Sequence, residues 1–107
     1  MMAERGAGEV PGAGFVPDRE GARWSFAGAL TYANAGAVLA AANALPLPAS
    51  GEVDLAGVGA VDSASVAVLL ALKRRANDEG RPLAFVNVPA ALASLSELYG
   101  VEEIVAA

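Results

Sequence analysis

Polar and hydrophobic residues alternate in the segment ARWSFAGAL, residues 22–30, where Trp24 and Phe26 are separated by polar side chains. This period of two predicts a strand with one buried face. Phe15 and Val16 lie upstream, before the turn residues PDREG, and we expect them to form a short strand that pairs with this one.

The period changes to that of a helix after this strand. Thr31 stands where an N-cap is preferred, and apolar side chains then recur at intervals of three and four residues: Tyr32, Ala35, Val38, Leu39 and Ala42. Pro46 and Pro48 end the predicted helix, because proline lacks the backbone N–H that a helix interior requires.

A strand and a helix follow in the same order. Residues 51–61, GEVDLAGVGAV, predict a central strand, in which Gly57 and Gly59 permit a close approach of the next element. A helix is expected over residues 63–79, and it ends at Gly80, because glycine is typical of helix C-termini.

Residues 82–88, PLAFVNV, predict a second buried strand. A third helix starts at Pro89, ends near Gly100 and carries three leucines: Leu92, Leu95 and Leu98. Ile104 and Val105 are expected to form a last short strand.

Strands that alternate with helices on short loops predict an α/β fold, with a mixed sheet of about four to five strands and helices packed against it. We expect this single domain to span residues 15–107. Residues 1–14 are rich in Gly, Ala, Glu and Pro and show no hydrophobic period, so they are expected to form a flexible N-terminal tail.

The amino-acid composition argues against several classes of function. The chain has no cysteine and no histidine, which removes disulfides, thiolate nucleophiles, the usual general base and the commonest metal ligand. We therefore expect no catalysis, no cofactor and no metal. The net charge of −5 argues against a nucleic-acid partner.

Two observations bear on location. The N-terminus lacks the apolar segment of a signal peptide. The most apolar window, residues 53–72, contains Asp54 and Asp62, and each would cost roughly 2.5–3.5 kcal/mol near the centre of a bilayer. We expect a cytoplasmic protein that does not insert into a membrane.

Asp62 and Ser63 lie at the junction between the central strand and the helix that follows. The simplest interpretation is structural: Asp62 caps the helix, and Ser63 and Ser65 fill its first turn. A second interpretation is functional, because a hydroxyl at a helix N-terminus is a suitable acceptor for a phosphoryl group.

The helix over residues 63–79 is apolar around its whole circumference, whereas a stripe about 100° wide is enough to face a sheet. If Val66, Leu69 and Leu70 face the sheet, five further residues cannot all do so: Ala64, Ala67, Val68, Ala71 and Leu72. Either a neighbouring helix covers these residues or they form an exposed patch for a partner.

The segment VDLAGVGAVDSASVAVLLALKRRANDEGRPLAFVNV resembles the core of STAS domains, the fold of bacterial anti-sigma-factor antagonists. The shared pattern is a strand ending in Asp-Leu, a short turn, and Asp-Ser/Thr-x-Gly opening an apolar helix. The tail ALASLSELYGVEEIV is similar to that of the STAS subunits (MlaB) of Mla phospholipid-transport ABC complexes. The resemblance covers roughly residues 24–105.

The resemblance implies a non-catalytic subunit that binds and supports the cytoplasmic ATPase of such a complex, at the inner membrane. By position, Ser63 falls where STAS switch proteins carry their phosphorylatable or partner-contacting Ser/Thr, and Asp62 matches the preceding acid. Ser65 replaces the family's glycine, which argues against the close approach of a kinase. Tyr99, in the Leu-Tyr-Gly segment, becomes an interface candidate.

Three alternatives stay open. The chain is an anti-sigma-factor antagonist switched by phosphorylation of Ser63, or a small hydrolase with Ser63 as nucleophile, for which the sequence pairs no base with it. A homodimer of the isolated chain is the third, because it would also cover the apolar helix.

Overall fold

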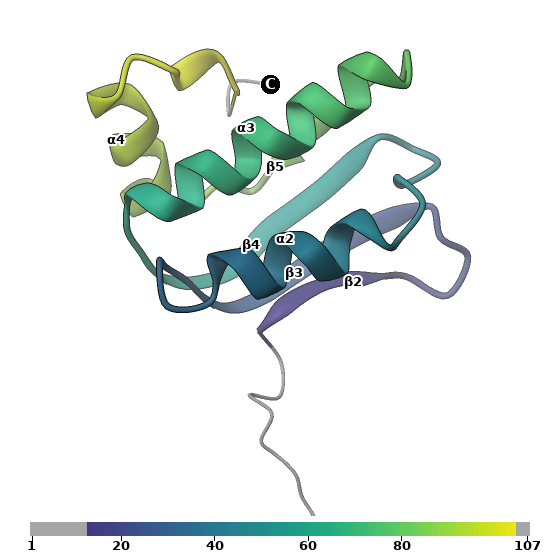
Figure 1. Ribbon diagram of the computed structural model, residues 1–107, viewed down its shortest axis with the longest axis horizontal. Coiled ribbons are helices and arrows are strands. Elements are labelled where there is room, and N and C mark those ends of the chain that lie inside the picture. The colour runs from purple at the N-terminus through teal and green to yellow at the C-terminus, as the bar shows by residue number, and fades with distance from the viewer. Residues whose placement is uncertain (1–12, 105–107) are drawn as a thin grey trace, which may run out of the picture.

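Four strands form a single sheet in the computed structural model, which describes residues 13–104 (Figure 1). Their order in the sheet follows the sequence: β2 (Gly14–Pro17), β3 (Arg23–Leu30), β4 (Glu52–Val61) and β5 (Ala84–Val86). β2 is antiparallel to β3, whereas β3, β4 and β5 are mutually parallel neighbours. The predicted mixed sheet is therefore confirmed.

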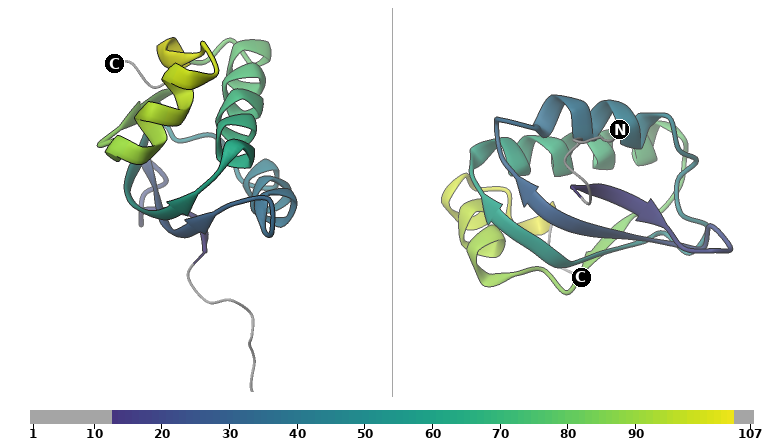
Figure 2. Two further views of the ribbon diagram at one scale, coloured as in Figure 1. Left: turned by 90° about the vertical axis from the view of Figure 1, so that its left-hand side faces the viewer. Right: turned by 90° about the horizontal axis from the view of Figure 1, so that it is seen from below.

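A helix connects the two strands of each parallel pair in the sheet. Helix α2 (Ala35–Asn43) connects β3 to β4, and helix α3 (Ser63–Asp78) connects β4 to β5. Both lie on the same face of the sheet (Figure 2), as two right-handed crossovers in sequential order require. Helix α4 (Ala90–Leu98) packs beside α3 and is followed by the short 3-10 helix η1 (Glu102–Ile104). No described element covers the opposite face of the sheet.

The core lies between the sheet and these helices. Alternate residues of β3 and β4 point into it, as the period of two predicts: Trp24, Phe26, Leu30, Val53 and Leu55. Val58 is also buried, but it follows Leu55 by three positions because the pairing of β4 with β3 is irregular between them. Phe15 from β2 joins them, with its ring centroid 5.5 Å from that of Trp24 and 4.8 Å from that of Phe26. These three rings fix the edge strand β2 to the rest of the sheet.

Gly57 lies in β4 at an irregularity of the pairing with β3, where Ser25 pairs with Asp54 but Ala27 pairs with Gly57. A Cβ atom at Gly57 would lie 2.4 Å from the carbonyl oxygen of Phe26. The sequence correctly indicated a close approach at this glycine, but the approaching element is the preceding strand and not the next helix. Gly59 has only ordinary spacing, with its nearest neighbour at 3.8 Å.

Helix α2 begins later than predicted. Its N-cap is Asn34, not Thr31, and the side-chain oxygen of Asn34 accepts a hydrogen bond from the Thr31 N–H at 3.0 Å. The Asn34 side-chain N–H₂ group donates to the carbonyl of Ala29 at 2.8 Å. These bonds fold residues 31–34 into a loop, so Tyr32 precedes the helix and is exposed.

The predictions for the two ends need correction. Gly14 already belongs to β2, and residues 1–12 of the predicted tail lie outside the described residues. Ile104 belongs to η1 and not to a strand, while Val105 lies outside the described residues.

Candidate functional site

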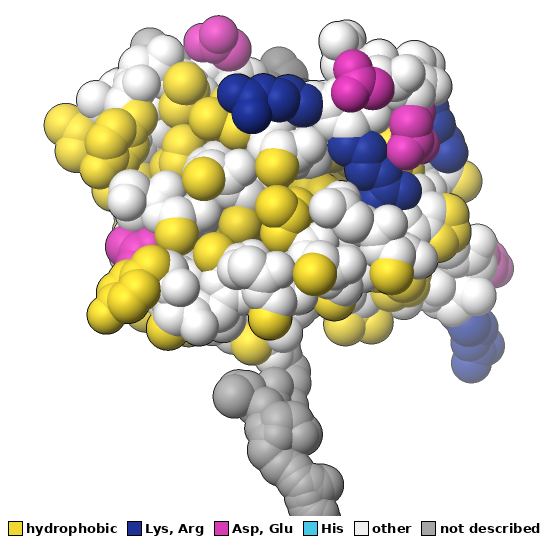
Figure 3. Space-filling view, in the orientation of Figure 1, with side chains coloured by type: hydrophobic (Ala, Val, Ile, Leu, Met, Phe, Trp, Pro, Cys, Tyr) yellow, Lys and Arg dark blue, Asp and Glu magenta, His cyan; other side chains and the backbone are white. Residues whose placement is uncertain are grey.

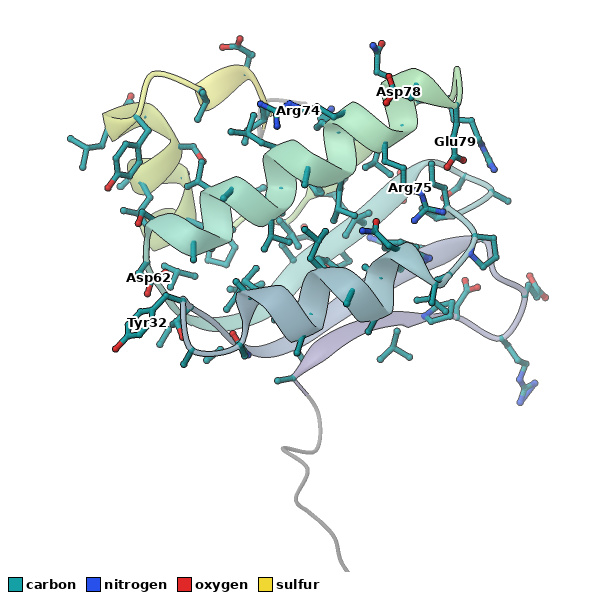
Figure 4. The ribbon with its side chains drawn as sticks, viewed as in Figure 1. Tyr32, Asp62, Arg74, Arg75, Asp78 and Glu79 are labelled. Carbon is teal, nitrogen blue, oxygen red and sulfur yellow. The ribbon has the colours of Figure 1, made fainter. Side chains whose placement is uncertain are left out.

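Asp62 holds the first turn of α3 in place. Its Oδ1 accepts a hydrogen bond from the Ala64 N–H at 2.9 Å, which confirms the predicted N-cap, a contribution of about 1 kcal/mol. Its Oδ2 accepts from the Tyr32 N–H at 3.0 Å, so the same carboxylate also holds the loop that precedes α2 (Figure 4). Asp62 thus fixes Tyr32 beside the N-terminus of α3.

Ser63 and Ser65 have opposite environments. Ser63, the first residue of α3, is exposed, and no described residue hydrogen-bonds its hydroxyl. Ser65 is fully buried, and its hydroxyl donates to the carbonyl of Asp62 at 2.6 Å. The expectation that Ser65 contacts a partner is therefore wrong, because its side chain points into the fold and does not obstruct an approaching protein.

The apolar circumference of α3 is largely explained by its neighbours. Val68 and Leu72 belong to the same buried cluster as Val38 and Ala42 of α2. Both are essentially inaccessible, at 2% and 0% exposure, so they are not part of a partner surface as the sequence suggested. They belong to the core that the sheet shares with α3 and with α2, which packs against α3, so the alternative of an exposed patch is wrong for these two residues.

The rest of this helix surface remains accessible near its N-terminus. Ala67 is exposed, and Ala64 and Ala71 are half-buried. A hollow of about 240 Å³ lies between α3 and the end of α4, lined by Ser63, Val66, Ala67, Leu70, Tyr99 and Val101. Only Ser63 among these residues is without an apolar body, so the hollow suits an apolar side chain.

Tyr99, which lines this hollow, is 53% exposed, and two further large apolar side chains are exposed nearby in the fold: Tyr32 at 84%, held by Asp62 beside the start of α3, and Leu98 at 75%, the last residue of α4. Apolar side chains gather at this end of the molecule, over α4, the start of α3 and the loop before α2 (Figure 3). We call this region the α3-head surface, defined by six residues: Tyr32, Ser63, Ala67, Leu70, Leu98 and Tyr99. Exposed aromatic residues of this kind are enriched at protein interfaces.

Charges are concentrated at the other end of α3 (Figure 4). Arg75 donates to the carbonyls of Ala42 and Leu45, at 3.1 and 2.6 Å, and pairs with Glu79 at 2.9 Å. Lys73 donates to the carbonyl of Leu83. These two cations tie α3 to α2 and to β5, so the basic cluster of the sequence is mainly structural.

Asp54 is the centre of a polar cluster on the uncovered face of the sheet. The Ala56 N–H donates to it at 2.9 Å and lowers the pKa of its carboxyl below the ordinary value. The side-chain amide of Asn87, at 3.2 Å, and Arg23, at 3.4 Å, lower this pKa further. Within residues 13–104, no group of acidic side chains is arranged to hold a metal ion.

None of the described helices is both long and apolar enough to span a bilayer.

The family model described as "Mlab, STAS domain" matches residues 16–106. The chain is a STAS-domain protein. No curated protein matches its sequence. STAS domains are generally non-catalytic and act through contacts with other proteins, and exposed apolar side chains such as those of the α3-head surface suit such contacts.

The sequence predicted Ser63, Ala67 and Tyr99 for the partner surface of this STAS domain, but not Tyr32, Leu70 or Leu98; Leu70 was expected to face the sheet and instead lines the hollow. Tyr32 fitted the helical period and was assigned to the helix. Asn34 was the available signal, because asparagine is at least as good an N-cap as threonine and would have placed Tyr32 in the preceding loop.

Proposed function

We propose that this STAS domain is the non-catalytic subunit that binds and supports the cytoplasmic ATPase of a phospholipid-transport ABC complex, which maintains lipid asymmetry of the outer membrane. The observation that carries this proposal is the α3-head surface, where large apolar side chains surround an exposed hydroxyl. In such a complex the chain lies in the cytoplasm and reaches the inner membrane only through its partner.

The size of this surface suits a protein partner. Fully burying a leucine-sized side chain contributes about 1.5–3 kcal/mol. Association costs roughly 4–15 kcal/mol in lost translational and rotational freedom, so one such side chain is not sufficient. Tyr32 lies beside the start of α3, and Leu98 and Tyr99 lie at the end of α4; each is more than half exposed, so a partner that covers this end of the molecule can bury all three.

Ser63 has a specific role in this proposal. Its hydroxyl is small and lies at the rim of the apolar hollow, where a partner excludes water from it. A negative charge at this position would lose its hydration on binding, and the N-terminus of α3 would offset only part of this loss, because the α3-head surface carries no cation. Unmodified Ser63 therefore favours binding, and a charged group there opposes it.

The second candidate is an anti-sigma-factor antagonist in which a kinase phosphorylates Ser63. One observation favours it: the hydroxyl is exposed at the N-terminus of a helix of 16 residues, where backbone N–H groups and the helix dipole stabilise a phosphate. Ser65 is not an obstacle to a kinase, since it is buried.

The hydrolase alternative has no such support. Asp62 is the carboxylate next to Ser63, and both of its oxygens already accept backbone hydrogen bonds. Among the described residues, Asp62 makes these two backbone bonds and none to the Ser63 hydroxyl, so no base is paired with the proposed nucleophile.

Affinity capture of the chain from its native host tests the proposal. Recovery of an ABC ATPase with unmodified Ser63 supports the transport role, and Ser63→Glu is expected to lose this ATPase. Ala40→Glu is the matched control, because Ala40 is exposed on α2 and lies outside the α3-head surface. Recovery of a kinase-like anti-sigma factor, with phosphate on Ser63, would contradict the transport role and establish the signalling one.

A further inference from the structure

The sheet ends at β2, whose outer edge is not paired with any described strand. The Asp18 N–H donates to the Arg23 carbonyl at 2.8 Å, and the pairing of Val16 with Ser25 continues the same register. Because hydrogen-bonded and non-hydrogen-bonded pairs alternate in antiparallel strands, Phe15 directs its N–H and C=O groups away from β3. An unpaired edge of this kind is a template for another strand.

A groove of about 430 Å³ lies beside this edge and is lined by residues of β2 and α2. Its lining contains no charged residue: Ala13, Gly14, Phe15, Val16, Asn34, Ala37, Val38 and Ala41. Helix α2 carries no charge anywhere, and residues 31–51 contain none at all. A helix that faces water normally has charged residues on its outer face, so this face of α2 has the composition of one that is covered.

We propose that this side of the molecule binds a second copy of the chain, through antiparallel pairing of the two β2 strands about a two-fold axis at Phe15. In this arrangement the two Phe15 residues exchange both backbone hydrogen bonds. Val16, which is 60% exposed, then lies beside Gly14 of the second copy, where no side chain competes for the space. The outer edge of β2 is therefore complementary to the same edge of a second copy.

Charge also favours a second copy as the occupant. Each chain carries a net charge of −5, so two copies repel one another over most of their surfaces. The β2 edge and the outer face of α2 are uncharged, and they are a side on which two copies can approach without this repulsion.

The size of the contact predicts its strength. A strand of four residues buries less than the roughly 1,200–2,000 Å² of a stable complex. Ala37 and Ala41, the exposed alanines of α2 that line the groove, add area, because small side chains let the second α2 come close. Pro17 lacks an N–H and limits the ladder at one end. The dimer is accordingly weak and depends on concentration.

This inference does not rest on the proposed function. β2 lies at one edge of the sheet, whereas α4 follows β5 at the opposite edge. The hollow between α3 and α4 therefore stays open in the dimer, and loss of dimerisation is separable from loss of a partner.

Sedimentation velocity of the full chain, from about 1 μM to about 1 mM, tests the proposal. We expect a monomer–dimer equilibrium that Ala37→Lys weakens at least roughly tenfold, because it places like charges across the two-fold axis. Ala40→Lys is the matched control: it adds the same charge to an exposed alanine of α2 that does not line the groove. A monomer at every concentration, or equal weakening by both variants, would overturn the proposal.

Two further measurements keep the test decisive. If Ala37→Lys does not fold, Val16→Lys on the strand edge is expected to weaken the dimer in the same way. Hydrogen exchange at the Phe15 amide is expected to slow as the chain concentration rises, because this N–H becomes bonded in the dimer. Slowing that occurs only when another protein is added would show that the groove accepts a partner's strand, and would contradict self-association.

Discussion

The two faces of helix α3 are similar in composition but differ in what covers them. Val68, Leu69 and Leu72 are buried by the sheet and by the flanking helices, whereas Ala67, and to a lesser degree Leu70, remain accessible beside Tyr99. The same contrast separates the two serines of the first turn, since Ser65 is fully buried and Ser63 is exposed. Hydrophobicity alone does not distinguish a packing face from a docking face; the positions of the neighbouring helices do.

The largest expected difference in unfolding free energy comes from adding a negative charge to the buried face of α3 or to its exposed face. Ser65→Glu buries a carboxylate without a cation and is expected to lower the free energy of unfolding by at least about 3 kcal/mol. Ser63→Glu adds its charge at the exposed N-terminus of the helix and is expected to stabilise it by about 0.3–1 kcal/mol. Urea denaturation at neutral pH measures both. Equal losses would abolish the distinction between the faces.

Truncation of leucines is expected to give the next largest contrast. Leu72→Ala removes a fully buried side chain and should cost about 2–5 kcal/mol of unfolding free energy, including the cavity it leaves. Leu70→Ala removes a half-buried side chain, so its cost should be less than half as large. Thermal or urea unfolding of the two variants provides the comparison. A similar cost for both would mean that Leu70 belongs to the core.

Asp62 connects the two regions, and its removal should have a moderate effect. Asp62→Ala loses the cap of α3 and the acceptor for the Tyr32 N–H, at a cost of about 0.5–2 kcal/mol. Hydrogen exchange at the Tyr32 and Ala64 amides is expected to become faster, while exchange in the middle of α3 changes little. Unchanged exchange at Tyr32 would show that Asp62 does not hold this loop.

The smallest effect is expected from a change at Asp54, on the uncovered face of the sheet, and this variant serves as a control for the changes in α3. Asp54 has a lowered pKa in the folded chain, so its contribution to stability is present above its ordinary pKa of 3.8 and is lost as the pH falls through the lower folded value. Asp54→Asn should remove this part of the acid dependence, measured by urea denaturation at several pH values, without altering partner binding. A changed affinity for the partner would indicate that the uncovered face of the sheet takes part in docking.

Much of the fold could be predicted because local patterns and tertiary packing agree. The alternation around Trp24 and Phe26 reflects a sheet with a single covered face, and Gly80 ends α3 in the left-handed conformation that glycine favours, with φ of 65°. A resemblance to a family and an unusually apolar helix indicated the same region, and they predicted a partner surface at Ser63, Ala67 and Tyr99, all of which the structure leaves exposed.

The remaining details depend on contacts that a sequence does not contain. Val68 and Leu72 were assigned to the surface because the helix period cannot reveal that α2 packs beside them. Tyr32 was missed because Thr31 and Asn34 are both suitable caps, and the choice depends on hydrogen bonds to Ala29 and Asp62. Both errors arose where a long-range contact, and not local preference, decided the outcome.

The most direct test of the central claim is isothermal titration calorimetry of the chain with the ABC ATPase that we propose as its partner, comparing Ser63→Glu with Ser63→Thr. We predict that Ser63→Glu weakens binding at least roughly tenfold, about 1.4 kcal/mol, because its charge is desolvated at the α3-head surface. Ser63→Thr keeps the hydroxyl and should bind nearly as tightly as the original chain. Equal affinities for the two folded variants would contradict the claim that this surface is the docking site.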